Sequence, residues 1–204
     1  MIKHLKHFLI LMTFLLAAVL LPLSVFAQQS HDRTIKKISW RNEPIKITQI
    51  KVDGAVVDFD KNFQAENDWL RSLTLSVTNT SDKAICYINI ALDFPRTKGQ
   101  QPPARDHLLW GRFRVLPDAN ELTENSKILK PGESIDLTFS DEEYRQTQDF
   151  LRQTNYSESI DLLEIIIDEI GFEGERDTLW INGQMMRRDP SNSRRWLPIR
   201  SENQ

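Results

Sequence analysis

Arginines that lie near tryptophans are the side chains of this sequence best suited to bind a partner. Between positions 107 and 116, Trp110, Arg112 and Arg114 alternate with Leu109, Phe113 and Val115, which predicts an edge strand with the first set exposed. The segment from Met185 to the C-terminus carries a net charge of +3. Arginine binds carboxylates and phosphates bidentately and stacks on aromatic rings. The predicted binding residues are Trp110, Arg112, Arg114, Arg187, Arg188, Arg194, Arg195 and Trp196.

Both groups also have a purely structural interpretation. The C-terminal arginines would form ion pairs with the acidic segment of the same chain. Trp110 would simply cover one end of the hydrophobic core. The sequence alone leaves both alternatives open.

The acidic segment, residues 158–177, contains eight carboxylates and one basic residue, Arg176. Carboxylates are suitable ligands for calcium, but their spacing here is not that of an EF-hand. The competing interpretation is a solvated acidic edge that discourages aggregation between strands. Asp168 and Asp177 are also the pair that a glycosidase-like hydrolase would need, with its carboxyl groups about 5–10 Å apart.

Other catalytic signatures are scarce. Only His31 and His107 follow residue 27, and Cys86 is the single thiol. His107 could act as an isolated acid or base, although a solvated loop histidine is the simpler interpretation. Cys86 shares the alternation of Ile88 and Ile90, which predicts a buried, unreactive thiol. We therefore expect no catalytic residues, no metal and no cofactor.

The first 27 residues have the layout of a secretory signal. Lys3 and Lys6 precede an apolar run of 14 residues that ends before Pro22, and Ala27 is a suitable cleavage position. The run is shorter than the roughly 20 residues of a membrane span. We expect cleavage, a secreted or periplasmic protein, and no membrane span in the mature chain.

Short segments with alternating apolar residues predict an all-β fold. Residues 73–78 and 86–94 are predicted to form a hairpin across the turn at 79–82, and Asn182-Gly183 predicts another hairpin. Further strands are expected at 45–52, 56–59, 135–139 and 163–167. Ser140 and Glu143 form the capping box of one short helix. About seven strands at this spacing are typical of an antiparallel, immunoglobulin-like β-sandwich.

The predicted organisation has four parts. A signal peptide (1–27) and a flexible leader (28–43) precede the β-sandwich domain (44–186), and a basic C-terminal tail (187–204) packs on it in part. Without disulfides, the apolar core must stabilise the domain.

Three further elements occur together in the sequence. They are the strand pair ending in Phe94-Pro95, the triplet Trp110-Gly111-Arg112, and the tail Arg187-Arg188-Asp189-Pro190 followed by Arg195-Trp196 and Pro198. On these residues the chain resembles a group of uncharacterised secreted bacterial β-sandwich (immunoglobulin-like) proteins. The resemblance implies the fold and the compartment, and no activity.

These observations favour an exported, non-catalytic binding module of the cell envelope or extracellular space. Its partner is expected to be a protein or a polysaccharide, and the oligomeric state is left open. A mature net charge of about −5 argues against a nucleic-acid partner. The alternatives are the carboxylate-based hydrolase and a structural accessory subunit of an envelope complex.

Overall fold

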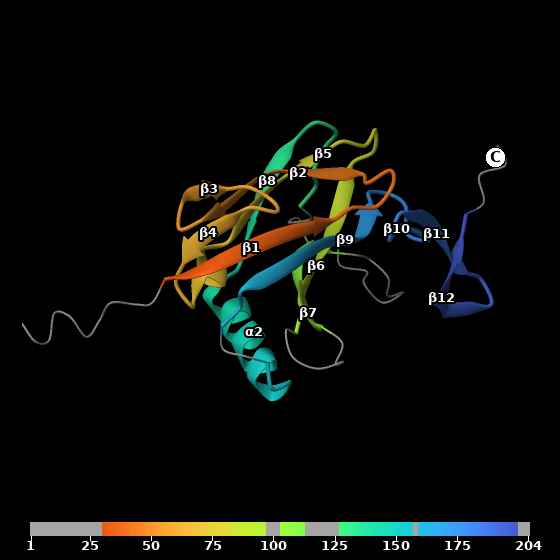
Figure 1. Cartoon of the computed structure of the whole chain (residues 1–204). Coiled ribbons are helices and arrows are strands. Elements are labelled where there is room, and N and C mark those ends of the chain that lie inside the picture. The colour runs from red at the N-terminus through yellow and green to blue at the C-terminus, as the bar shows by residue number, and fades with distance from the viewer. Residues whose placement is uncertain (1–29, 97–102, 113–126, 157–158, 200–204) are drawn as a thin grey trace, which may run out of the picture. The chain divides into compact units, whose positions relative to one another are not determined.

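Two β-sheets pack against each other and enclose the apolar stripes that the sequence predicts (Figure 1). The computed structural model describes residues 30–96, 103–112, 127–156 and 159–199, and from His31 onward the chain forms one unit. The strands are β1 (His31–Ile38), β2 (Ile45–Val52), β3 (Ala55–Val57), β4 (Asn62–Ala65), β5 (Thr74–Asn79), β6 (Ile85–Phe94), β7 (Ala104–Gly111), β8 (Ser134–Thr138), β9 (Leu162–Phe172), β10 (Thr178–Ile181), β11 (Gln184–Asp189) and β12 (Asn192–Pro198).

The larger sheet is organised around β9. β6 pairs with one edge of β9 and with β7. The other edge of β9 pairs first with β1, in parallel, and then with β10. β4 continues the sheet beyond β1, and β11 and β12 continue it beyond β10. The smaller sheet has the order β3-β2-β5-β8.

The apolar stripes face one another across the interior. Leu75, Ile90 and Ile165 are fully buried, and Phe139 is 8% exposed. These residues come from both sheets or follow directly on a strand, as a two-layer sandwich requires. The predicted all-β sandwich with one short α-helix is confirmed for the described part of the chain.

The predicted hairpin between 73–78 and 86–94 is wrong. β5 pairs with β2 and β8 in the smaller sheet, whereas β6 pairs with β7 and β9 in the larger sheet. The turn at 79–82 therefore carries the chain from one sheet to the other. Because each strand still directs one apolar stripe inward, the sequence pattern is the same for a hairpin and for a crossover.

Asn79 holds this crossover in place. Its side chain is fully buried and occupies an inward position of β5. Its Nδ2 donates to the carbonyl oxygens of Lys83 (2.8 Å) and Leu129 (2.9 Å). Its Oδ1 accepts from the backbone N–H (3.0 Å) and hydroxyl (2.7 Å) of Ser81. All four hydrogen-bonding positions of the amide are thus used.

Two terminal segments are more ordered than expected. The segment 28–43, predicted as a flexible leader, contains β1, in which Ile35 and Arg33 are fully buried. The guanidinium of Arg33 contacts Asp161 and Ser159 just before β9 and Asn67 before β5. Segment 187–204, predicted as a tail, contains the end of β11 and all of β12. Polar residues on these strands concealed their pairing.

Helix α2 (Asp141–Gln153) closes one end of the interior. Ser140 caps it, and the Glu143 side chain accepts from the Ser140 backbone N–H at 2.8 Å, which confirms the capping box. Leu151 is buried, and the Thr147 hydroxyl donates to Asp106 on the inward face of β7. Short 3-10 helix η2 (Trp69–Ser72) lies beside α2.

We expect Asn79→Ala to lower the free energy of unfolding by about 2–4 kcal/mol, because four hydrogen bonds of a buried amide are lost. Chemical denaturation measures this. Asn62→Ala, which removes an exposed asparagine with one hydrogen bond to Thr34, should cost less than about 1 kcal/mol. Equal losses in the two variants would contradict the proposed role of Asn79.

Candidate partner-binding site

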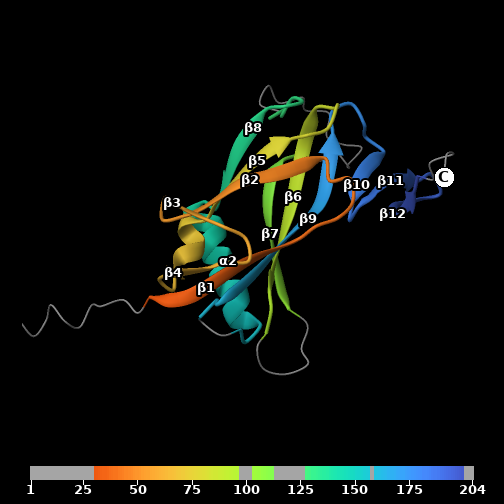
Figure 2. The same cartoon turned by 45° about the horizontal axis from the view of Figure 1, so that its top comes forward.

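Strands β10, β11 and β12 form an arm that extends the larger sheet beyond the sandwich. Figures 1 and 2 show the arm projecting at the end away from α2. No side chain of β12 is buried, and in β11 only Asp189 is. The Asn182-Gly183 turn between β10 and β11 has φ of 46° and 89°, as the predicted two-residue hairpin requires. β11 and β12 are therefore largely accessible to a partner, whereas Leu179 and Trp180 of β10 are buried.

Irregular pairing near the tip of the arm presents two of the predicted arginines. Asp189 pairs with Asn192, but the preceding residue, Arg188, pairs with Trp196. Ser193, Arg194 and Arg195 consequently bulge out of the β11–β12 ladder. Bulges redirect side chains away from a sheet. Both arginines are exposed.

Arg188 is held against the arm itself. Its guanidinium lies 5.3 Å from the centre of the Trp196 ring, and its Nε is 3.8 Å from an Asp177 carboxylate oxygen. The side chain of Arg188 is 14% exposed. Arg188 therefore contacts other residues of the arm and is less accessible to a partner than an exposed arginine.

The predicted ion pairing with the acidic segment involves only this arginine among those described in the arm. Arg187, Arg194 and Arg195 are exposed, and within the described residues no carboxylate lies within ion-pair distance of them. The acidic residues have other partners: Asp161 binds Arg33, Glu169 binds Tyr87 and Asn89, and Glu175 binds Lys83. Three arginines are thus available to a partner.

A pocket of about 460 Å³ lies at the base of the arm. It is formed by the β1–β2 loop, the β5–β6 crossover and the β10–β11 hairpin, and its lining residues are Asn42, Glu43, Pro44, Thr80, Ser81, Asp82, Lys83, Phe172, Trp180, Gly183 and Met185. Trp40 lies next to the hairpin, since a Cβ on Gly183 would lie 3.3 Å from the Trp40 Cβ. Sequence reasoning missed this pocket because three distant loops create it.

The other predicted arginine group does not form the expected exposed face. Trp110 is half-buried and packs against the core, whereas Leu109 is 52% exposed. The predicted alternation is present, but its exposed and inward faces are reversed, so Trp110 packs against the core as the structural alternative predicts. Arg112 is exposed just after β7. Arg114 lies outside the described residues.

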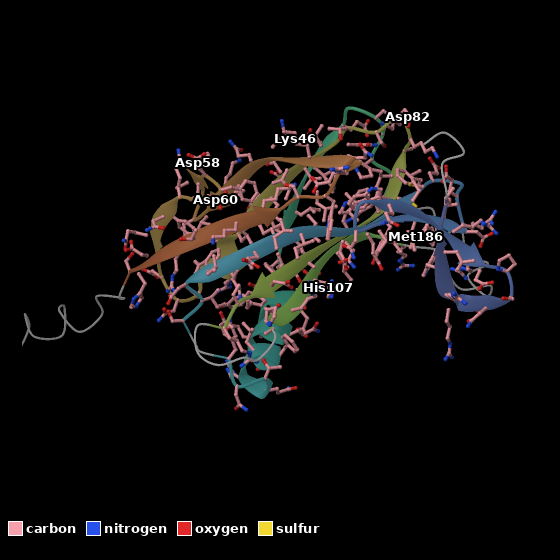
Figure 3. The ribbon with its side chains drawn as sticks, turned by 45° about the vertical axis from the view of Figure 1, so that its right-hand side comes forward. Lys46, Asp58, Asp60, Asp82, His107 and Met186 are labelled. Atoms are coloured by element: carbon pink, nitrogen blue, oxygen red, sulfur yellow. The ribbon has the colours of Figure 1, made fainter. Side chains whose placement is uncertain are left out.

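His107 belongs to a hydrogen-bonded network on the outer face of the larger sheet. Its Nδ1 is 2.9 Å from Asn89 Oδ1, and Asn89 Nδ2 is 3.4 Å from Glu169 Oε2, which also accepts from the Tyr87 hydroxyl at 3.4 Å. Figure 3 shows His107 on the opposite outer face from Lys46. Burial, followed by the charge of Glu169, raises the pKa of Tyr87 to about 12.

Asp168 and Asp177 lie in different surroundings. Asp168 lies on β9, where it contributes to the raised pKa of Tyr87. Asp177 lies in the β9–β10 turn next to Arg188. Neither lines the arm pocket or the 290 Å³ pocket beside α2. The described residues also contain no group of three His, Cys, Asp or Glu placed to hold a metal ion.

Cys86 departs from the predicted fully buried position. The β6–β9 register shifts between Ile85 and Tyr87, which displaces Cys86 from the inward stripe. Cys86 is partly buried, and its thiol donates to the Gly171 carbonyl at 3.6 Å.

Comparison of the chain with protein-family models, curated proteins and solved structures gives no match. Across the described ranges, no helix has the length and apolarity needed to cross a membrane.

Gly111, next to Trp110, should tolerate no side chain. Its φ is +75°, and an added Cβ would lie 2.0 Å from the Cys86 carbonyl oxygen. Gly54 has φ +77° but no atom within 4 Å of the corresponding position. Gly54→Ala should cost about 1–2 kcal/mol from backbone strain alone, and Gly111→Ala at least about 2 kcal/mol more in chemical denaturation. Similar costs would contradict the close contact.

Glu169→Gln should lower the pKa of Tyr87 from about 12 towards 10, leaving the contribution of burial. Because folding raises this pKa, the associated stability is complete below pH 10 and is lost as the pH rises from about 10 to 12. NMR titration of the tyrosine ring measures the pKa. Glu164→Gln, on the same strand, should leave it unchanged; an equal effect would contradict the specific role of Glu169.

Proposed function

We propose that this protein is a non-catalytic binding module of the cell envelope or extracellular space, and that its arm binds an anionic partner. The observation that carries the proposal is the set of exposed arginines on the arm, Arg187, Arg194 and Arg195, which lack ion pairs within the described residues.

The chemistry of the arm favours carboxylate groups on the partner. Guanidinium groups bind carboxylates through paired hydrogen bonds, and each exposed pair contributes modestly. Three arginines on one projecting element allow several contacts at once. Acidic proteins and acidic polysaccharides both present carboxylates in series.

The proposed location rests on the sequence of the first 27 residues. Their charged start, apolar run and small residue at position 27 are typical of a secretory signal.

The proposal is tested with a triple variant, Arg187→Gln, Arg194→Gln and Arg195→Gln. Binding to poly-L-glutamate and to polygalacturonate is measured at several salt concentrations. We expect the wild-type protein to bind at least one polymer and the variant to bind it about ten-fold more weakly, with a shallower salt dependence. The melting temperature should stay nearly unchanged because the three side chains are exposed.

A control variant removes the same charge elsewhere: Lys46→Gln, Lys127→Gln and Lys130→Gln, all at exposed positions. It should bind like the wild-type protein. Equal weakening of both variants, or no binding of the wild-type protein to either polymer, would overturn the proposal.

A further inference from the structure

We infer that the pocket and the adjoining face of the arm form one groove, which binds an extended acidic peptide segment with an aromatic side chain. This inference rests on the proposed function and specifies its partner. The pocket contributes Trp180 and Met185, which are cross-strand partners on β10 and β11. Arg187, two residues beyond Met185, lies on the same face of the arm because side chains alternate along a strand.

The pocket is large and apolar enough for an aromatic side chain. Its volume of about 460 Å³ falls within the usual range of ligand pockets, about 300–1,000 Å³. Pro44, Phe172, Trp180 and Met185 provide apolar lining. Aromatic side chains gain much of their binding free energy from burial against such surfaces.

A second observation points to an occupant that carries a hydrogen-bond acceptor. Trp180 is 2% exposed, and its indole N–H has no hydrogen-bond partner among the described residues. Buried indole N–H groups usually have one. Because neighbouring atoms cover the indole nitrogen, a backbone carbonyl of a bound peptide would accept from it only after the pocket lining shifts.

The lining of the pocket favours a peptide over a sugar. The hydroxyl of Thr80 donates to Pro44, and that of Ser81 to Asn79 and Lys83. Glu43 accepts from Lys37 and from the Trp40 backbone, and Lys83 pairs with Glu175. Among the described residues, the polar lining groups without a hydrogen bond or ion pair are the side chains of Asn42 and Asp82 and the Trp180 indole N–H. Most hydroxyls of a buried sugar would therefore lose hydrogen bonds to water without replacing them.

Charge fixes the position of the acidic residue. Arg187 is exposed and unpaired within the described residues, whereas exposed Asp82 lines the pocket and would repel a carboxylate. Met185 and Arg187 are about 7 Å apart along the strand, which equals two residues of extended peptide. An acidic residue two positions from the aromatic one would therefore meet Arg187.

The test uses three peptides: acetyl-Ser-Phe-Ser-Asp-Ser-amide, its Ala-for-Phe analogue and its Asn-for-Asp analogue. Each is titrated into the purified protein, and NMR follows affinity and the indole N–H resonance of Trp180. The protein variants are Arg187→Gln and, for the pocket, Trp180→Phe. Trp180 is almost completely buried, so its replacement can also destabilise the fold. Met185→Ala is therefore a second pocket variant, at a half-buried position. Lys46→Gln, at an exposed position of β2 that does not line the pocket, is the charge-matched control.

We expect the Phe peptide to bind at least about ten-fold more tightly than the Ala analogue and to shift the Trp180 resonance. Both pocket variants should reduce this preference. Arg187→Gln should abolish the preference for Asp over Asn, and Lys46→Gln should change neither preference.

Equal affinities for the Phe and Ala peptides, or no binding of either, would overturn the groove. Arm-dependent binding to poly-L-glutamate or polygalacturonate would then still support the proposed function. Loss of the Asp preference in Lys46→Gln as well would overturn the assignment of the acidic residue to Arg187.

Discussion

The buried side chain of Asn79 is the constraint on which the rest of the structure depends. A polar amide in an apolar interior is stable only when all its hydrogen bonds are made, and the chain around Asn79 makes all four. Those bonds fix the crossover between the sheets and the segment before β8. The same crossover forms one wall of the arm pocket. The four hydrogen bonds of Asn79 therefore stabilise both the connection between the sheets and one wall of the pocket.

Irregularities in strand pairing determine which side chains are exposed on each face of the larger sheet. A shift in the β6–β9 register displaces Cys86 from the interior, and a second shift in the same pair lies near Glu169. On the arm, the bulge in β12 separates Arg194 and Arg195 from the regular ladder. Each local irregularity changes the exposure of the residues beside it, whereas the apolar stripes preserve the two-layer fold.

Features encoded by neighbouring residues could be predicted from the sequence. The Asn182-Gly183 hairpin, the capping box at Ser140 and the inward stripes around Leu75 and Ile165 are examples. Features that depend on distant partners could not. Alternation does not distinguish a hairpin from a crossover, so the pairing of β5 and β6 was mispredicted, and the polar composition of β1 and β12 hid two strands. The arginine-rich arm was recognised by composition, but the pocket required the folded arrangement of three loops.

The parallel pairing of β1 with β9 has a consequence for biosynthesis. Arg33 and Asp161, which join these two regions, are 128 positions apart in the chain. During translation, the first strand emerges from the ribosome long before its neighbour is made. The larger sheet can be completed only when most of the polypeptide has been synthesised, and contacts of such separation slow folding. Until then, β1 has no native place in the sheet between β4 and β9.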